Sequence, residues 1–171
     1  MKIFLMGYMG SGKSAIGKRL AEKLNLSFID LDDYIEKHER RTISEIFSAE
    51  GEDKFRAIEH KQLKTILDKK NAVVSLGGGT PCFHDNISLI NKNGKSFYLE
   101  VSVDDLVKRL NKAKRKRPLI EGMNEIDLKY FIEANLEKRT PIYKTANYTI
   151  QIGKQSIEEV AEQISSFIYK L

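Results

Sequence analysis

The segment GYMGSGKS at residues 7–14 constrains the fold of this chain more than any other stretch. It matches G-x-x-x-x-G-K-[ST], a pattern whose backbone amides surround phosphate when it joins a buried strand to a helix. Both neighbours are present. An apolar run at 2–6 (KIFLM) stops at Gly7, and residues 13–25 place Ile16, Leu20 and Leu24 on one helical face. The N-terminus is therefore predicted to be the strand–loop–helix unit of a nucleoside-triphosphate site.

The rest of the chain continues the alternation of strand and helix. We expect further strands at 27–30, 72–76, 96–101 and 148–152, and helices at 42–49, 53–69, 84–92, 103–112, 125–138 and 156–170. Two helices begin with capping boxes, Thr42 with Glu45 and Ser156 with Glu159. The last helix carries an apolar stripe that we interpret as core: Ile157, Val160, Ile164, Phe167 and Ile168. This order predicts a mostly parallel sheet with helices on both faces and ligands at the carboxyl ends of its strands.

Composition limits the class of protein. With 171 residues, no repeat and no linker-like stretch, the chain is expected to form one domain, 1–171. Cys82 is the only cysteine, and no apolar run is long enough to span a bilayer or export the chain, so we expect a cytoplasmic protein without a membrane partner. His38, His60 and His84 are interpreted as surface residues. The net charge of +5 favours an anionic partner.

Residues 10–15 are the candidate ATP ligands of the glycine-rich loop: Gly10, Ser11, Gly12, Lys13, Ser14 and Ala15. Glycines let backbone amides turn toward phosphate oxygens, and the start of the following helix adds partial positive charge. Lys13 is expected to reach the β- and γ-phosphates as a catalytic group, and the Ser14 hydroxyl is expected to bind Mg²⁺.

A loop of this kind occurs in hydrolysing switches and in kinases, and two features favour a kinase. The chain contains no D-x-x-G motif, and NKNG at 91–94 has glycine where a guanine-reading N-K-x-D motif has aspartate. After the second predicted strand the chain reads DLDD at 30–33. As residues i and i+2 of a strand end, Asp30 and Asp32 would face one side, about 6.6 Å apart. One carboxylate could then act on Mg²⁺-bound water while the other accepts a proton from an attacking hydroxyl.

Arginines and glycines supply candidate contacts to a small anion. The third predicted strand ends in a glycine triplet at 77–79, which lets a ligand approach backbone amides closely. Arg56 lies in a predicted helix, and Glu59, three residues on, could hold its guanidinium in place. Arg139 is expected to close a helix before Pro141. A guanidinium suits bidentate recognition of a carboxylate.

The run KAKRKRP at 112–118 is the most basic segment. It could be a solvated stretch or a nucleic-acid contact. The run is short, lies between two predicted helices and lacks aromatic residues that stack on bases. We interpret it as part of a lid, about 111–122, that brings cations such as Arg117 over the triphosphate.

Taken together, these motifs resemble the shikimate kinase family, from the glycine-rich loop to about residue 145. They occur in the family's order: GxxGxGKS at 7–14, D-x-D at 30–32, GE-x-x-FR-x-x-E at 51–59, the glycine triplet at 77–79, RPL at 117–119, and R-x-PIY at 139–143. The resemblance implies a P-loop three-layer α/β/α fold of the nucleoside-monophosphate-kinase type, with a five-stranded parallel sheet and a substrate-binding segment near 31–60.

The same resemblance implies ATP-dependent phosphorylation of the 3-hydroxyl of shikimate, with Mg²⁺ as cofactor. The positions that match shikimate ligands are Asp32, Arg56, Gly78 and Arg139, the arginines binding its carboxylate and Asp32 its hydroxyls. Asp32 also matches the proposed catalytic base. Arg117 matches a catalytic lid arginine that meets ATP, Arg109 a residue flanking adenine, and Asp30 a group that acts on the Ser14-bound Mg²⁺ through water.

Three alternatives remain at this stage. A gluconate kinase or a nucleoside-monophosphate kinase of the same fold would also use Arg56 and Arg139. A basic nucleic-acid-binding protein would use the run at 112–118 as its contact surface.

The loop before the last helix, QIGKQS at 151–156, departs from the family's usual D-x-x-R-x-P. We expect a monomer without a nucleic-acid partner.

Overall fold

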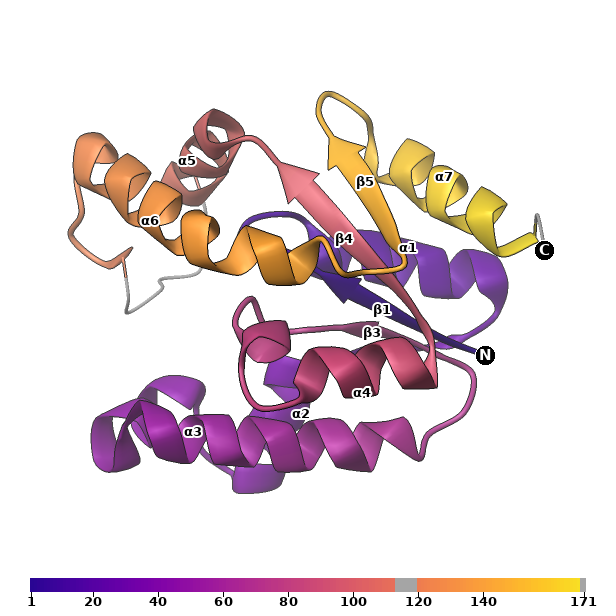
Figure 1. The fold of residues 1–171 in the computed structure, drawn as a ribbon, viewed down its shortest axis with the longest axis horizontal. Coiled ribbons are helices and arrows are strands. Elements are labelled where there is room, and N and C mark those ends of the chain that lie inside the picture. Colours follow the sequence, from indigo (N-terminus) through magenta and orange to yellow (C-terminus); the bar gives the residue numbers. More distant parts are fainter. Residues whose placement is uncertain (113–119, 170–171) are drawn as a thin grey trace.

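The computed structural model describes residues 1–112 and 120–169, and within them the chain forms a sheet of five parallel strands in the order β2-β3-β1-β4-β5 (Figure 1). The strands are β1 Lys2–Met6, β2 Ser27–Asp30, β3 Ala72–Ser75, β4 Lys95–Val101 and β5 Tyr148–Ile152. The strands predicted from the sequence are confirmed to within a residue or so. Central β1 pairs with β3 and β4, so the loop that follows it opens between two neighbours.

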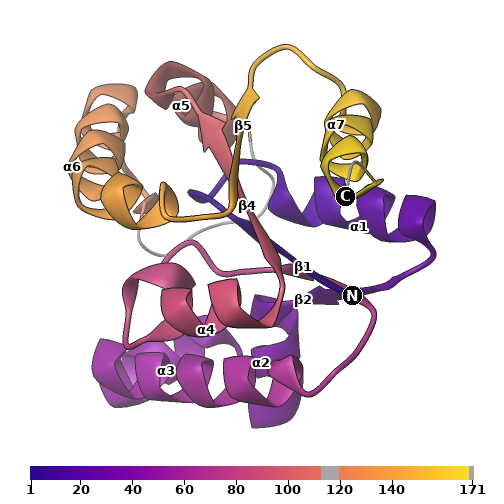
Figure 2. The same cartoon turned by 45° about the vertical axis from the view of Figure 1, so that its right-hand side comes forward.

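Helices cover both faces of the sheet, as Figures 1 and 2 show. On one face α1 Lys13–Leu24 packs against α7 Ile157–Tyr169. Toward the other face lie α2 Leu31–Glu39, α3 Ile43–Leu67 and α4 Asn86–Asn93. Near the carboxyl ends of the strands, α5 Val103–Asn111 packs against α6 Glu125–Tyr143, and the short 3-10 helix η1 Thr80–Cys82 follows the glycine triplet. The predicted three-layer α/β/α fold is confirmed.

Alternate residues of β1 serve two cores. Ile3 and Leu5 belong to the cluster that includes α1 and α7, whereas Phe4 and Met6 belong to the cluster under α2 and α3. All four side chains are fully buried, as expected for a central parallel strand covered on both faces.

Helix α2 was not predicted. The segment DLDD was interpreted as the end of a strand, but it places a cap and acidic residues at a helix start. Asp30 is the N-cap, and its side chain accepts a hydrogen bond from the Asp32 amide at 3.1 Å. Asp32 and Asp33 then lie in the first turn, where negative charge is favourable.

Among the other expectations, one pair of helices is confirmed and two points need correction. The helices predicted at 42–49 and 53–69 are confirmed: both lie within α3, and the non-helical Gly51 (φ 81°, ψ 176°) separates them at a kink. Helix α6 continues through Pro141 to Tyr143, so Arg139 lies inside the helix and does not close it. Ile157 is 48% exposed because it stands at the first residue of α7, above the edge of the core. Both predicted capping boxes are confirmed.

The histidines divide into two kinds. His38 and His84 are exposed, as predicted, but His60 is partly buried and its Nδ1 lies 2.6 Å from Asn86 Oδ1. Among the described helices, none combines the length and apolar composition that crossing a bilayer requires.

Candidate active site

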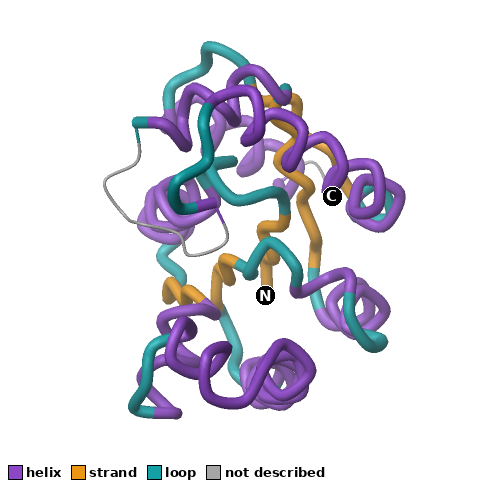
Figure 3. Tube along the Cα trace, turned by 90° about the vertical axis from the view of Figure 1, so that its left-hand side faces the viewer, coloured by secondary structure: helices purple, strands orange, loops and turns teal. Residues whose placement is uncertain are grey.

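A cavity of about 590 Å³ opens at the carboxyl ends of the strands, beside the start of α1 and helices α2, α3 and α6. Figure 3 looks onto this end of the sheet. The cavity brings together most of the site residues predicted from the sequence: Gly10, Gly12, Lys13, Ser14, Ala15, Asp30, Asp32, Arg56, Gly78, Arg109 and Arg139. Ser11 is buried beneath the glycine-rich loop, where its amide donates to the Tyr8 carbonyl at 3.1 Å. Arg117 and most of the predicted lid lie outside the described residues.

The glycine-rich loop has a backbone that favours glycine. Gly10 (φ 83°) and Gly12 (φ 92°, the N-cap of α1) are left-handed, a conformation that a Cβ makes unfavourable. The first turn of α1 carries no acidic side chain, so its unpaired amides present partial positive charge at the cavity. Lys13 Nζ donates to the carbonyls of Gly7 (2.9 Å) and Tyr8 (3.0 Å), which hold the ammonium over the loop. This end of the cavity suits a polyphosphate.

Three oxygen-bearing side chains meet beside the loop. Ser14 Oγ donates to Asp30 Oδ2 at 2.5 Å and lies 3.4 Å from Ser75 Oγ. Asp30 is placed there because it ends β2 and caps α2. Hydroxyl and carboxylate oxygens are the donors that Mg²⁺ prefers, usually together with phosphate and water. The residues present therefore fit a Mg²⁺ ion that arrives with the nucleotide.

Asp32 reaches the cavity by a different route from the one predicted. Because β2 ends at Asp30, the two aspartates are not residues i and i+2 of one strand, and Asp32 projects from the first turn of α2. A Cβ at Gly77 would lie 2.8 Å from Asp32 Oδ1 and 3.0 Å from Glu59 Oε1. The missing side chain of Gly77 thus allows the two carboxylates to converge on the β3 end.

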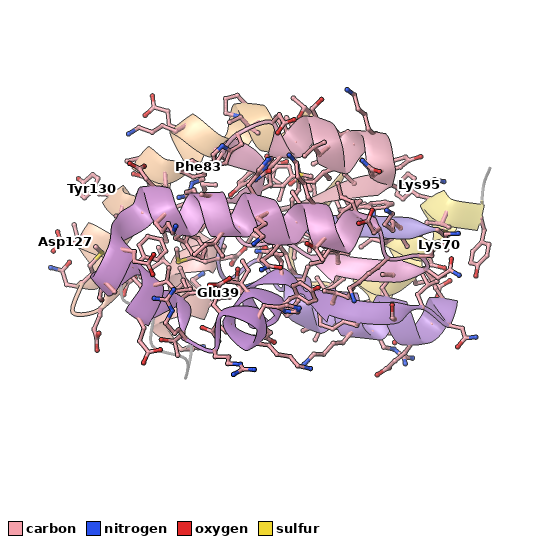
Figure 4. The ribbon with its side chains drawn as sticks, turned by 90° about the horizontal axis from the view of Figure 1, so that it is seen from below. Glu39, Lys70, Phe83, Lys95, Asp127 and Tyr130 are labelled. Carbon is pink, nitrogen blue, oxygen red and sulfur yellow. The ribbon has the colours of Figure 1, made fainter. Side chains whose placement is uncertain are left out.

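Arg56 is held from several sides. It is only 8% exposed, and Nη1 donates to Glu59 Oε2 at 2.9 Å, which confirms the predicted pairing. Nε and Nη2 donate to Glu52 Oε1 at 3.2 and 3.0 Å. The ring of Phe83 stacks 4.1 Å from its Cζ, and Figure 4 labels Phe83 beside α3. A guanidinium ordered in this way is prepared for an anionic ligand.

Arg139 faces Arg56 across the glycine triplet. Its Cζ lies 5.6 Å from the centre of the Tyr8 ring, and a Cβ at Gly78 would lie 3.8 Å from Arg139 Nη1. Tyr143, one helical turn further on, donates from its hydroxyl to the Gly78 carbonyl. Burial raises the pKa of the Tyr143 phenol well above its ordinary value, with Arg139 opposing the rise, so the hydroxyl remains a donor.

A smaller cavity of about 240 Å³ adjoins the glycine-rich loop on its other side. It is lined by Gly10, Arg109, Ile152, Gln155, Ser156, Ile157 and neighbouring residues. Arg109 Nη1 lies 3.5 Å from the Gly10 carbonyl, and the Gln155 side chain closes its own loop by bonding Gly153 N and Gln151 O. Ile157, which is exposed at the start of α7, is one of the residues that line this cavity.

Residue patterns did not identify several supporting side chains. Tyr8, Thr80, Phe83 and Tyr143 come from three separate segments, and none was assigned a role in the site, although Tyr8 and Tyr143 lie within the motifs at 7–14 and 139–143. For Tyr143 one signal was present, because it stands four residues after Arg139 on the helix and so shares its face.

The fold and the site define a class. One cavity contains a P-loop that can hold a triphosphate, an acidic pair beside it, and two arginines around a glycine triplet. This combination is typical of a P-loop kinase that acts on a small anionic substrate.

Comparisons with known proteins narrow that class. The shikimate kinase family profile matches residues 9–169. The curated shikimate kinase of Parabacteroides distasonis is 42% identical over 99% of this chain and 98% of its own length. The crystal structure of shikimate kinase from Bacteroides thetaiotaomicron superposes with a TM-score of 0.94 at 40% identity, covering 99% of this chain and 98% of that one. Shikimate kinase from Acinetobacter baumannii in complex with shikimate gives 0.91 at 32% identity, covering 99% and 93%. This chain belongs to the shikimate kinase family.

Proposed function

We propose that the chain transfers the γ-phosphoryl group of ATP to the 3-hydroxyl of shikimate, giving shikimate 3-phosphate and ADP. One observation carries the proposal: the P-loop and the two arginines Arg56 and Arg139 border the same cavity. A relative of the same fold was solved in complex with shikimate, which supports this choice of acceptor.

The acceptor half of the cavity would bind shikimate through charge and shape. Arg56 and Arg139 bind its carboxylate, since each guanidinium offers a fork of N–H donors. Gly78 lies beside Arg139 and against the backbone of the glycine-rich loop, and it would contact shikimate through its own backbone. Asp32 binds the ring hydroxyls and orients the one that attacks.

Phosphoryl transfer then depends mainly on position and charge. Lys13 exchanges its loop carbonyls for the β- and γ-phosphate oxygens, and amides of residues 10–15 surround the triphosphate. Asp32 accepts the proton of the attacking hydroxyl. Ser14 would hold Mg²⁺ directly, and Asp30 would act on it through water. When bound, the ion neutralises phosphate charge.

Adenine would occupy the smaller cavity, flanked by Arg109 and by Ile157 on the other helix. The guanidinium and the apolar side chain offer flat and apolar contact to an aromatic base. The loop 151–156 contributes its backbone and Gln155 rather than the family's usual residues.

The remaining sequence-based predictions are kept as proposals. The chain acts as one domain and as a cytoplasmic monomer without a nucleic-acid or membrane partner. Segment 31–60 binds the substrate, and a lid at 111–122 brings Arg117 to ATP.

An ADP-release assay with MgATP tests the function over shikimate, gluconate and nucleoside monophosphates. We expect kcat/KM to be highest for shikimate by at least about 100-fold, because the chain belongs to the shikimate kinase family. A tenfold preference for gluconate or for a nucleoside monophosphate would overturn the proposal.

A further inference from the structure

We propose that Thr80 is a positioning residue for the substrate carboxylate, acting through Glu59 on Arg56. The inference rests on the proposed role of Arg56 in binding shikimate. It concerns the residue that follows the glycine triplet, which lies outside the motifs used to predict the site.

The two carboxylates that accept hydrogen bonds from Arg56 differ in how strongly they hold it. The side chain of Glu52 is 54% exposed, whereas that of Glu59 is 1% exposed. Water competes for the exposed Glu52 carboxylate and weakens its attraction for the Arg56 guanidinium, while the attraction of the buried Glu59 is screened very little. Glu59 therefore does more to fix the orientation of the guanidinium.

The second step is what holds Glu59. Its Oε2 accepts from Arg56, and its Oε1 accepts from Thr80 Oγ1 at 2.6 Å. A carboxylate is an acceptor only, so the Thr80 hydroxyl must be the donor. Thr80 is completely buried, so no water replaces this donor if it is removed. The short, charge-assisted bond thus fixes the rotation of the carboxylate that faces Arg56.

The third step is what holds Thr80. Its amide donates to the Gly77 carbonyl at 3.1 Å, and its carbonyl accepts from Asn86 Nδ2 at 2.8 Å. Asn86 is fully buried, and its Oδ1 lies 2.6 Å from His60 Nδ1. Because the amide nitrogen of Asn86 donates to Thr80, its oxygen accepts, so His60 Nδ1 carries the proton.

These bonds form a closed circuit. It leaves α3 at Glu59, crosses to Thr80, passes to Asn86 at the start of α4, and returns to α3 at His60, the residue next to Glu59. The segment after the glycine triplet is therefore attached to the arginine-bearing helix at two adjacent points. The attachment sets the distance between the triplet and Arg56, both of which face the substrate carboxylate in the proposed complex.

Two substitutions separate the hydroxyl of Thr80 from its packing. Thr80→Val keeps the shape and removes the donor, and Thr80→Ser keeps the donor and removes a methyl group. Shikimate affinity by calorimetry, the KM for each substrate, kcat and the melting temperature are measured for both. Arg56→Ala is the reference for full loss of the proposed contact.

For Thr80→Val we expect the dissociation constant and KM of shikimate to rise roughly 5- to 50-fold, with kcat and the KM of ATP changed less than about threefold. Thr80→Ser should remain within about threefold of the wild type in shikimate affinity, although the cavity it leaves lowers the melting temperature. If Thr80 acted only through packing, Thr80→Ser would lower shikimate affinity at least as much as Thr80→Val does. That result would overturn the inference.

If Thr80→Val does not fold, Thr80→Ala compared with Thr80→Ser isolates the same hydroxyl, and equal shikimate affinities would overturn the inference. Failure of the underlying function is distinguishable. If Arg56→Ala leaves shikimate affinity unchanged, the proposed role of Arg56 is wrong. If Arg56→Ala weakens binding and Thr80→Val does not, only the role of Thr80 is wrong.

Discussion

A single methyl group added at Gly79 is expected to disable the substrate-carboxylate site while leaving the fold intact. The Cβ of Gly79→Ala would lie 2.7 Å from both Nη1 and Nη2 of Arg56 and 2.9 Å from its Cζ. Carbon and nitrogen atoms in contact normally stand about 3.5 Å apart, so the guanidinium must move by roughly 0.8 Å. Gly79 has φ −88° and ψ −20°, which alanine adopts readily, so the effect is steric and not a backbone penalty.

Arg56 has little room to yield. The Phe83 ring lies 4.1 Å from its Cζ, and the Glu59 carboxylate accepts at 2.9 Å. A shift of this size breaks the alignment with Glu59 and with an incoming carboxylate. Losing one hydrogen bond to a charged group costs about 1.5–3 kcal/mol, which corresponds to an affinity for shikimate lower by about 10- to 150-fold.

Calorimetric titration with shikimate measures this change, and a parallel titration with MgATP should give an unchanged affinity. Gly153→Ala is a matched control, since its Cβ would meet only Gln155 Oε1, at an ordinary 3.5 Å. The control should bind shikimate like the wild type. If Gly79→Ala binds shikimate within about threefold of the wild type, Arg56 tolerates displacement and the steric reasoning is refuted.

Three further predictions test other parts of the site. Arg139→Ala should weaken shikimate binding at least about tenfold by calorimetry with MgATP affinity nearly intact, because a guanidinium contact to the carboxylate is lost. Arg109→Ala should raise the KM of ATP several-fold and leave the KM of shikimate unchanged in steady-state assays, because it lines the smaller cavity and lies against the Gly10 carbonyl of the glycine-rich loop. Burial raises the pKa of the Cys82 thiol, with Arg139 and Arg56 opposing the rise, so iodoacetamide at pH 7.5 should modify it several-fold more slowly than free cysteine.

Each of these has a result that would contradict it. Unchanged shikimate affinity in folded Arg139→Ala removes that residue from the acceptor site. A rise in the KM of shikimate for Arg109→Ala shows that the two cavities are not separate in function. Alkylation of Cys82 as fast as that of free cysteine shows that its thiol is not held in the protonated form.

Local pattern predicted the framework well, for an identifiable reason. Parallel strands buried on both faces are short apolar runs bounded by glycine, so their limits can be read directly from the sequence. The phosphate loop is also local, since its glycines, lysine and serine act through consecutive backbone atoms. Helix α2 was missed because Asp30 and Asp32 were interpreted as the end of a strand, whereas Asp30 ends the strand and caps the helix that follows.

The sequence by itself determined the class of fold, the phosphate loop and the pairing of Arg56 with Glu59, because each depends on residues within one or two helical turns. Only the tertiary structure decided which distant side chains support the site. Thr80 reaches Glu59 and Tyr143 reaches Gly78 across 21 and 65 positions of the chain. Such bonds depend on how α3, α6 and the end of β3 pack around one cavity, and no local periodicity encodes that packing.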